Sequence, residues 1–264
     1  SSDNPASDWL DSGSDVVIEY GGGIYYNPGS EEAREHIVAG VEEIVRNYDV
    51  DGIHFDDYFY PTTDSAFDAD TYSDYKASGG KLSLGDWRRD NVDQLVREVY
   101  STIKSIDSSV RFGISPQGNT SINYSEQYID VEEWLSNPGY VDYICPQVYY
   151  GFENDTCPFA ATVAEWNSLI RRNDIDLYIG ISASKIGLVD QWAGSGKNEW
   201  AENDDMLVRM VSEEQPLQRI LYVQLPVIVC AGCGGSRSGG AGKGSSVRTD
   251  VTGVSEDDQN CQSF

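Results

Sequence analysis

Strand-like and helix-like segments alternate through most of the sequence, and this alternation limits the possible folds more than any other feature. Strand-like segments are short and rich in β-branched residues, whereas apolar residues in the helix-like segments recur every three to four positions. Strands are expected at residues 50–57, 111–115, 141–148, 177–182 and 220–229, and helices at residues 30–48, 86–106, 125–135, 159–172 and 200–212. Strand–helix–strand repeats produce parallel strands, so the sequence predicts an α/β protein with these strands side by side.

Polar residues at the strand ends distinguish between an open sheet and a closed barrel. The sequence contains no glycine-rich phosphate-binding motif after any predicted strand, which disfavours a nucleotide-binding open sheet. Polar side chains follow successive strands instead, namely Asp56, Ser115, Gln147 and Ser182. In a (β/α)8 TIM-type barrel such ends meet at one mouth, where the active site lies. We therefore expect the barrel.

Charge and cysteine content limit the partners and cofactors. Asp and Glu number 44 against 18 Lys and Arg, a net charge of −26 that is typical of a salt-adapted or a secreted acidic protein. This charge disfavours nucleic acid and anionic membranes, and no apolar run is long enough for membrane insertion. Two histidines are too few for a His-rich metal centre, and Cys230 and Cys233 lack a second pair, so neither metal nor cofactor is expected. No sequence pattern indicates an oligomeric state.

The segment Asp51–Pro61, DGIHFDDYFYP, carries the strongest functional signal. Side chains alternate along a strand, so His54 and Asp56 share one face and Ile53 and Phe55 share the other. The apolar pair suits packing against helices, which turns His54 and Asp56 into the barrel. An inward carboxylate at a strand end is costly unless it is paired or functional. Asp56 is therefore the predicted catalytic carboxylate, with Asp57 as its orienting partner or as a cap of the next loop.

Several motifs resemble those of the bacterial glycosyl hydrolase-like 10 family, a family of (β/α)8 barrels. The matches are DGIHFDDYFYP at 51–61, Asn27-Pro28-Gly29, Trp87-Arg88-Arg89, FGISP at 112–116, Asp142-Tyr143-Ile144 with Pro146-Gln147, and Tyr178-Ile179-Gly180. The resemblance implies a glycoside hydrolase acting on polysaccharide, with bacterial cell-wall glycan strands as the expected class and an extracellular or cell-envelope location. The family's first two strands have no counterpart before Trp9, so residues 1–230 are expected to form a barrel incomplete at its N-terminus. Residues 231–264, rich in Gly and Ser, are expected to be a disordered tail.

Further site residues are expected at the same strand ends. Glycoside hydrolysis normally uses two carboxyl groups, and Glu153 is the first choice for the second one, with Asp155 and Asp57 as alternatives. The candidates for hydrogen bonds or stacking with sugar are Asn27, His54, Tyr58, Ser115, Gln147, Tyr149 and Lys185, and Trp192 is a further stacking candidate. The alternative function is a non-catalytic carbohydrate-binding protein on a degenerate barrel.

Overall fold

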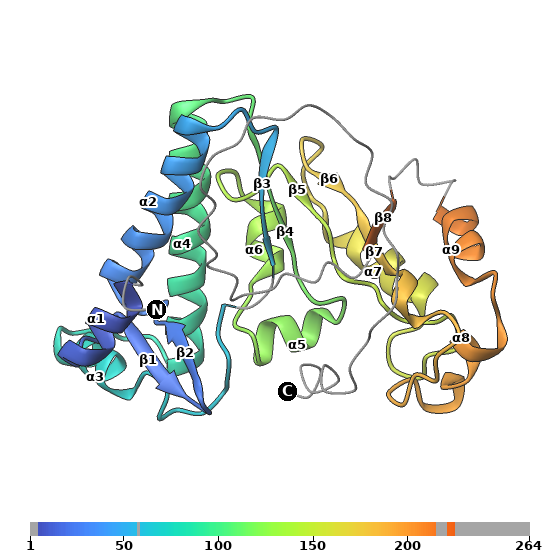
Figure 1. The fold of residues 1–264 in the computed structure, drawn as a ribbon, viewed down its shortest axis with the longest axis horizontal. Helices are drawn as coiled ribbons and strands as arrows, with labels where there is room; N and C mark the ends of the chain where they lie inside the picture. Colours follow the sequence, from blue (N-terminus) through green and yellow to red (C-terminus); the bar gives the residue numbers. More distant parts are fainter. Residues whose placement is uncertain (1–4, 57–58, 215–220, 225–264) are drawn as a thin grey trace, which may run out of the picture. The chain divides into compact units, whose positions relative to one another are not determined.

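The computed structural model describes residues 5–56, 59–214 and 221–224 (Figure 1). The chain divides into two units, Ser1–Pro226 and Val227–Phe264. The second unit lies outside the described residues, and so do the expected tail at 231–264 and the cysteines Cys230 and Cys233.

A parallel sheet forms the centre of the first unit. Its strands are β3 (Gly52–Asp56), β4 (Arg111–Ser115), β5 (Tyr143–Ile144) and β6 (Asp176–Leu177), adjacent in that order. Each neighbouring pair is parallel, and Asp56 lies opposite Ser115 in the first pair. The prediction that these four segments lie side by side in parallel is confirmed.

Two further strands pair separately and are also parallel. They are β7 (Ile179–Ser182) and β8 (Leu221–Gln224). The predicted strand 177–182 is interrupted at Tyr178, yet a parallel bridge from Gln147 to Gly180 links β7 to the segment that follows β5. The α/β class is thus confirmed. Within the described residues, the parallel strands β3 to β8 do not form a complete eight-stranded barrel.

Helices separate the strands, as the alternation predicts. They are α2 (Glu31–Asn47), α3 (Ala69–Ala77), α4 (Leu84–Ile106), α5 (Thr120–Ser125), α6 (Val131–Ser136), α7 (Phe159–Leu169), α8 (Glu199–Glu202) and α9 (Met206–Glu214), with 3-10 turns at Ala183–Lys185 and Gly194–Gly196. The prediction of a single helix at 125–135 is wrong. Asn119 and Asp130 each cap the start of their own helix through a side-chain oxygen, so the segment forms α5 and α6 instead. The helix expected at 200–212 is likewise divided into α8 and α9.

An antiparallel hairpin precedes the sheet. It joins β1 (Val17–Tyr20) to β2 (Gly23–Tyr26), and α1 (Pro5–Ser12) comes before it. Gly21 and Gly22 form the turn with φ of 57° and 85°, a conformation that glycine adopts without steric cost. This region has a small apolar cluster of its own, built around Val16, Val17 and Ala33.

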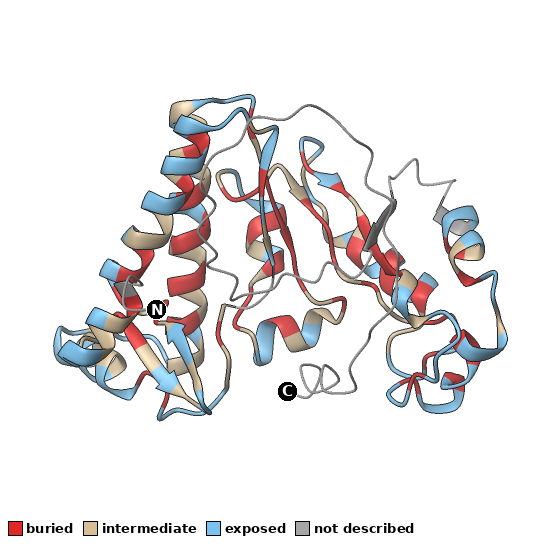
Figure 2. Ribbon diagram, viewed as in Figure 1, coloured by how far each residue is buried: buried red, intermediate tan, exposed pale blue. Residues whose placement is uncertain are grey.

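The main core lies between the parallel sheet and its helices (Figure 2). The strand residues Phe112, Ile114 and Ile144 are fully buried in it, together with Trp134 of α6 and Trp166 of α7. Along β4 the buried apolar residues alternate with Gly113 and Ser115, which lie opposite His54 and Asp56 of β3. Among the described residues, no helix is both long and apolar enough to cross a membrane.

A buried ion pair attaches the loop after β3 to α4. Arg88 and Asp68 have side chains with no exposed surface, and the guanidinium donates two hydrogen bonds to the carboxylate, of 2.5 and 2.9 Å. Arg88 also donates to the carbonyl of Asp64 at 2.7 Å and to the Tyr128 hydroxyl at 2.9 Å. Three of these four hydrogen bonds fasten the long loop after the Asp56 strand, and the fourth ties the same guanidinium to Tyr128.

Asp93 of α4 should make stability depend on pH. Burial, more than its acidic neighbours Asp130 and Glu133, raises the pKa of Asp93 to about 7, although the Trp134 indole donates to it at 2.6 Å. The folded state therefore keeps this proton to higher pH than the unfolded chain does, and stability falls as pH rises from about 4 to 7. Asp93→Asn should stabilise the protein by about 1–2 kcal/mol above pH 7, after allowance for partial exposure.

The measurement is urea unfolding of both proteins at pH 5 and pH 8.5. The gain should shrink towards zero at the lower pH, where the native aspartate is already largely protonated in the fold. An equal gain in the free energy of unfolding at both pH values would show that the charge of Asp93 plays no part.

Candidate active site

Asp56, Ser115 and Gln147 come together at the carboxyl ends of three neighbouring strands. Asp56 ends β3, Ser115 ends β4 opposite it, and Gln147 follows β5. The Gln147 amide nitrogen donates to the Asp56 carboxylate at 2.6 Å and to the Ser115 carbonyl at 2.9 Å. One amide thus spans three strands and holds the carboxylate at a defined position, with its charge partly balanced by an N–H dipole.

The alternation along β3 places Asp56 on the face away from the core. Ile53 is buried and Phe55 packs against the main core, whereas His54 and Asp56 are exposed. His54 and Asp56 on one face and Ile53 and Phe55 on the other agree with the expected alternation along the strand. A carboxylate on this face keeps access to solvent and to a ligand.

His54 interacts with Tyr143 across the intervening strand. Its Nδ1 lies 2.9 Å from the Tyr143 hydroxyl, and the rings are stacked at 5.8 Å with an angle of 18°. Partial withdrawal of the imidazole from water lowers the pKa of His54 although the residue keeps exposed surface, and the nearby Asp56 carboxylate opposes this effect. The imidazole is therefore neutral over a wider pH range than a free histidine.

Ser115 and Tyr149 lie in the same region but differ in access. Ser115 is 9% exposed, and its hydroxyl donates to the Cys145 carbonyl at 2.9 Å. The half-buried Tyr149 ring lies beside Gly180, where an added methyl carbon would be 3.6 Å from the ring. Tyr149 therefore keeps part of its ring at the surface, whereas Ser115 mainly joins β4 to β5.

The predicted second carboxylate lies in the loop after β5. The Glu153 side chain is exposed, and its backbone N–H donates to the buried Glu199 carboxylate at 2.9 Å. Asp155 accepts hydrogen bonds from the backbone and hydroxyl of Ser195, which lower the pKa of Asp155. Asp155 therefore joins two loops, and Glu153 has the freer carboxylate of the two.

Two predicted sugar-binding residues have partners inside the chain. Asn27 is fully buried, where it donates to the Asp15 carbonyl at 2.9 Å and to the Thr71 hydroxyl at 2.8 Å. Without exposed surface it holds the region after the hairpin, a structural role in place of the predicted sugar contact. Lys185 is half-buried and pairs with the buried Asp190 at 2.8 Å. Asp57 and Tyr58, also predicted, lie outside the described residues.

Two residues of this region were missed by sequence reasoning about the site. Tyr143 has the same strand phase as Cys145 and Gln147, and this parity in the segment 141–148 was a usable signal. Glu199 had no such signal, because its burial depends on the approach of two loops that are distant in sequence.

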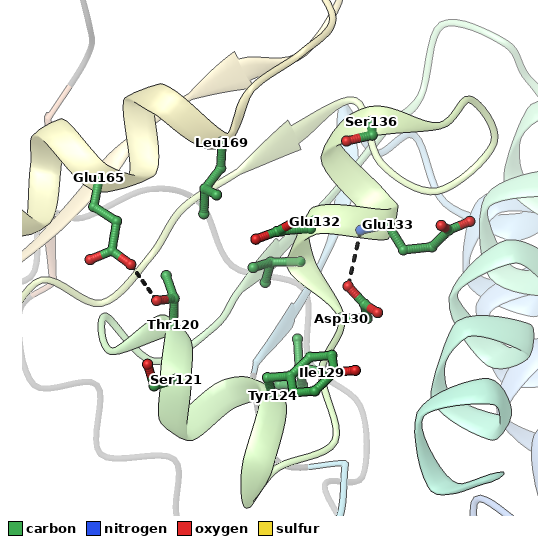
Figure 3. A pocket seen from close by; sticks show the side chains of 11 residues that line it. Thr120, Ser121, Tyr124, Ile129, Asp130, Glu132, Glu133, Ser136, Glu165 and Leu169 are labelled. Carbon is green, nitrogen blue, oxygen red and sulfur yellow. Dashed lines mark hydrogen bonds between the residues drawn. The ribbon is translucent and has the colours of Figure 1, made fainter. Parts of the chain in front are cut away.

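A hollow of about 730 Å³ lies among α5, α6 and α7 (Figure 3). Acidic side chains line much of it, from Asp130, Glu132, Glu133 and Glu165, and Glu165 is hydrogen-bonded to Thr120. Its lining shares no residue with the strand-end group. Across the described ranges, no three His, Cys, Asp or Glu side chains are grouped so as to hold a metal ion.

Comparisons with known proteins agree with the motifs at these strand ends. Residues 1–200 match the family described as Glycosyl hydrolase-like 10. The chain is 38% identical over 189 residues to the glycosyl hydrolase YngK of Bacillus subtilis (strain 168), covering 65% of this chain and 37% of that protein. It is 35% identical over 196 residues to the glycosyl hydrolase DigH of Escherichia coli (strain K12), covering 68% of this chain and 42% of that protein. The chain thus spans about two fifths of the length of these relatives.

Proposed function

Because the chain belongs to the glycosyl hydrolase-like 10 family, we propose that it hydrolyses O-glycosidic bonds of a polysaccharide with Asp56 as the central carboxylate. The observation that carries the proposal is the position of Asp56 at the carboxyl end of β3, held by the Gln147 amide at 2.6 Å. A carboxylate so placed stabilises positive charge that develops on a sugar ring as the glycosidic bond breaks, or attacks that ring.

Glu153 is our proposed partner carboxyl group. Protonation of the leaving oxygen needs an acid on the substrate side of the site, and Glu153 is exposed on the loop that follows β5. Gln147 and Tyr149 come from the same segment: the Gln147 amide nitrogen holds Asp56, which leaves the amide oxygen as its group for sugar, and Tyr149 supplies an aromatic ring. Asp57 remains the alternative partner.

The proposed substrate is a glycan strand of a bacterial cell wall, met outside the cell or in the cell envelope. A net charge of −26 disfavours polyanionic polymers and is compatible with neutral or cationic sugars. Both relatives are named glycosyl hydrolases. The experiment is incubation of the protein with purified cell-wall glycan strands, with release of new reducing ends as the readout and a polyanionic glycan as control.

A non-catalytic carbohydrate-binding protein is the second candidate. It is favoured by the incomplete ring of described strands and by the loop position of Glu153. The same incubation distinguishes the two: retention of glycan without new reducing ends supports binding alone, whereas new reducing ends that depend on Asp56 support hydrolysis.

Trp192→Ala should weaken binding of long glycans. Trp192 is 76% exposed in the loop after β7, and its backbone N–H donates to Asp190 at 3.1 Å. Asp190 is itself buried and paired with Lys185, so the loop presents the ring on a fixed backbone. Loss of a stacking ring should lower affinity about three- to tenfold.

Titration with glycan oligomers of increasing length measures this effect. Trp192→Phe should keep most of the affinity, and Val208→Ala, which truncates a 68% exposed side chain on α9, should change nothing. Equal affinities of the alanine variant and the native protein would remove Trp192 from the binding surface.

A further inference from the structure

Three adjacent strands build the contact between His54 and Tyr143. His54 lies opposite Gly113 in the β3–β4 pair, and Gly113 lies opposite Tyr143 in the β4–β5 pair. A methyl carbon at Gly113 would lie 2.2 to 2.4 Å from the Tyr143 ring, so only glycine leaves room for it. The ring therefore crosses β4 at Gly113 and reaches the imidazole on the far side.

Other groups hold the Tyr143 ring in this position. The Arg111 guanidinium, on β4, lies 5.1 Å from the ring centroid, and the Tyr178 ring meets it edge-on at 5.3 Å. Arg111 in turn donates to the Tyr178 hydroxyl at 2.9 Å and to Asp176 at 2.6 Å. Tyr143 is thus a restrained hydrogen-bonding group, unlike a tyrosine on a loose surface.

The restrained Tyr143 hydroxyl beside Nδ1 influences which nitrogen of the His54 imidazole carries the proton. A neutral imidazole carries one proton, so when Nδ1 accepts a hydrogen bond the proton lies on Nε2. A phenol is a good donor, and the lowered pKa of His54 keeps the ring neutral. We propose that Tyr143 is a positioning residue that donates to Nδ1 of His54 and so holds His54 as the Nε2–H tautomer.

This tautomer gives the Asp56 face of β3 a neutral hydrogen-bond donor. His54 and Asp56 are two residues apart on one face, and the carboxylate is near enough to act on the charge of the imidazole. A neutral donor beside a carboxylate binds a sugar oxygen without neutralising the charge that hydrolysis needs. This use of the donor rests on the proposed function, whereas the tautomer itself does not.

The tautomer is tested by nitrogen-15 NMR of the imidazole rings. The chain has two histidines, His36 and His54, so a His36→Gln variant assigns the signals. Above the pKa of His54, its Nε2 should carry the proton and its Nδ1 should give the signal of an acceptor. Tyr143→Phe should mix the tautomers and raise the pKa of His54, because a hydrogen bond to the neutral form is lost.

Tyr178→Phe is the matched control, since it removes a hydroxyl from the neighbouring ring that does not contact the imidazole nitrogen. It should leave the His54 tautomer unchanged. A native His54 with its proton on Nδ1, or an equal response to both substitutions, would overturn the proposal. Asp56 on β3 is the charged group that acts on the imidazole, whereas Arg111 on β4 lies against the Tyr143 ring and pairs with Asp176 on β6; none of the variants alters these three residues.

Kinetics test whether Tyr143 acts through His54. Tyr143→Phe should lower kcat about tenfold, on the scale of one hydrogen bond. In a His54→Gln background, where the amide has no tautomers, the same substitution should have little further effect, whereas a merely structural role would give additive losses. Absence of turnover in a protein that keeps the Nε2–H tautomer would contradict the proposed function and leave the tautomer assignment standing.

Discussion

Asp56→Asn is expected to reduce turnover on glycan strands by about 100-fold or more. The substitution keeps the shape of the side chain and an oxygen that accepts the hydrogen bond from Gln147. It removes the negative charge that, in the proposed function, stabilises or attacks the sugar cation. The free energy of unfolding should hold or rise, since Asp56 is exposed and the substitution removes one negative charge from a chain of net charge −26.

The readout is release of reducing ends together with a melting curve for each variant. Glu132→Gln is the matched control, because Glu132 is an exposed acid lining the hollow among α5, α6 and α7, and it should retain native turnover. Asp57→Asn should lower turnover less than Asp56→Asn does and should lower the free energy of unfolding more. A folded, inactive Asp57→Asn beside a nearly native Asp56→Asn would instead make Asp57 the catalytic residue.

Arg88→Met is expected to lower the free energy of unfolding by about 3–5 kcal/mol. The substitution leaves the Asp68 carboxylate buried without its cation, in a site where neither side chain has exposed surface. It also removes the donors to the Asp64 carbonyl and the Tyr128 hydroxyl. Because these contacts fasten the loop that follows β3, the strand that carries Asp56, the substitution should also lower turnover.

Urea unfolding measures this effect, and the next residue provides the control. Arg89 pairs with Asp86 at 2.7 Å, but the Asp86 side chain is 51% exposed. Arg89→Met should therefore cost no more than about 1 kcal/mol. Similar losses of unfolding free energy for the two variants would mean that the contribution of the Arg88–Asp68 pair to stability does not depend on its burial.

Short-range patterns predicted much of the fold. The strands β3, β4, β5 and β7 lie within the predicted segments because period-two alternation and β-branched residues are properties of five to eight consecutive residues. The division of the helix expected at 125–135 was missed. It depends on two caps, Asn119 and Asp130, whose oxygens compete with continuation of the helix, and apolar spacing does not report that competition.

Residue type was a weaker guide to the candidate site than strand position. Asp56 and Gln147 were placed at strand ends, and the structure joins them. Asn27 was chosen as a polar residue in a matching motif, yet it is fully buried with its amide bound to Asp15 and Thr71. The sequence does not distinguish an asparagine whose amide bonds to other parts of the chain from one whose amide binds a sugar. Only the surrounding structure distinguishes them.

The α/β class, the parallel strands and the strand that carries Asp56 could all be predicted from local periodicity. The contacts of Gln147 with Asp56 and of Tyr143 with His54 could not be predicted in this way, because they join residues 91 and 89 positions apart. Such contacts depend on the register between strands and on the space left at Gly113. Register is set by the packing of the whole sheet against its helices, which no single segment encodes.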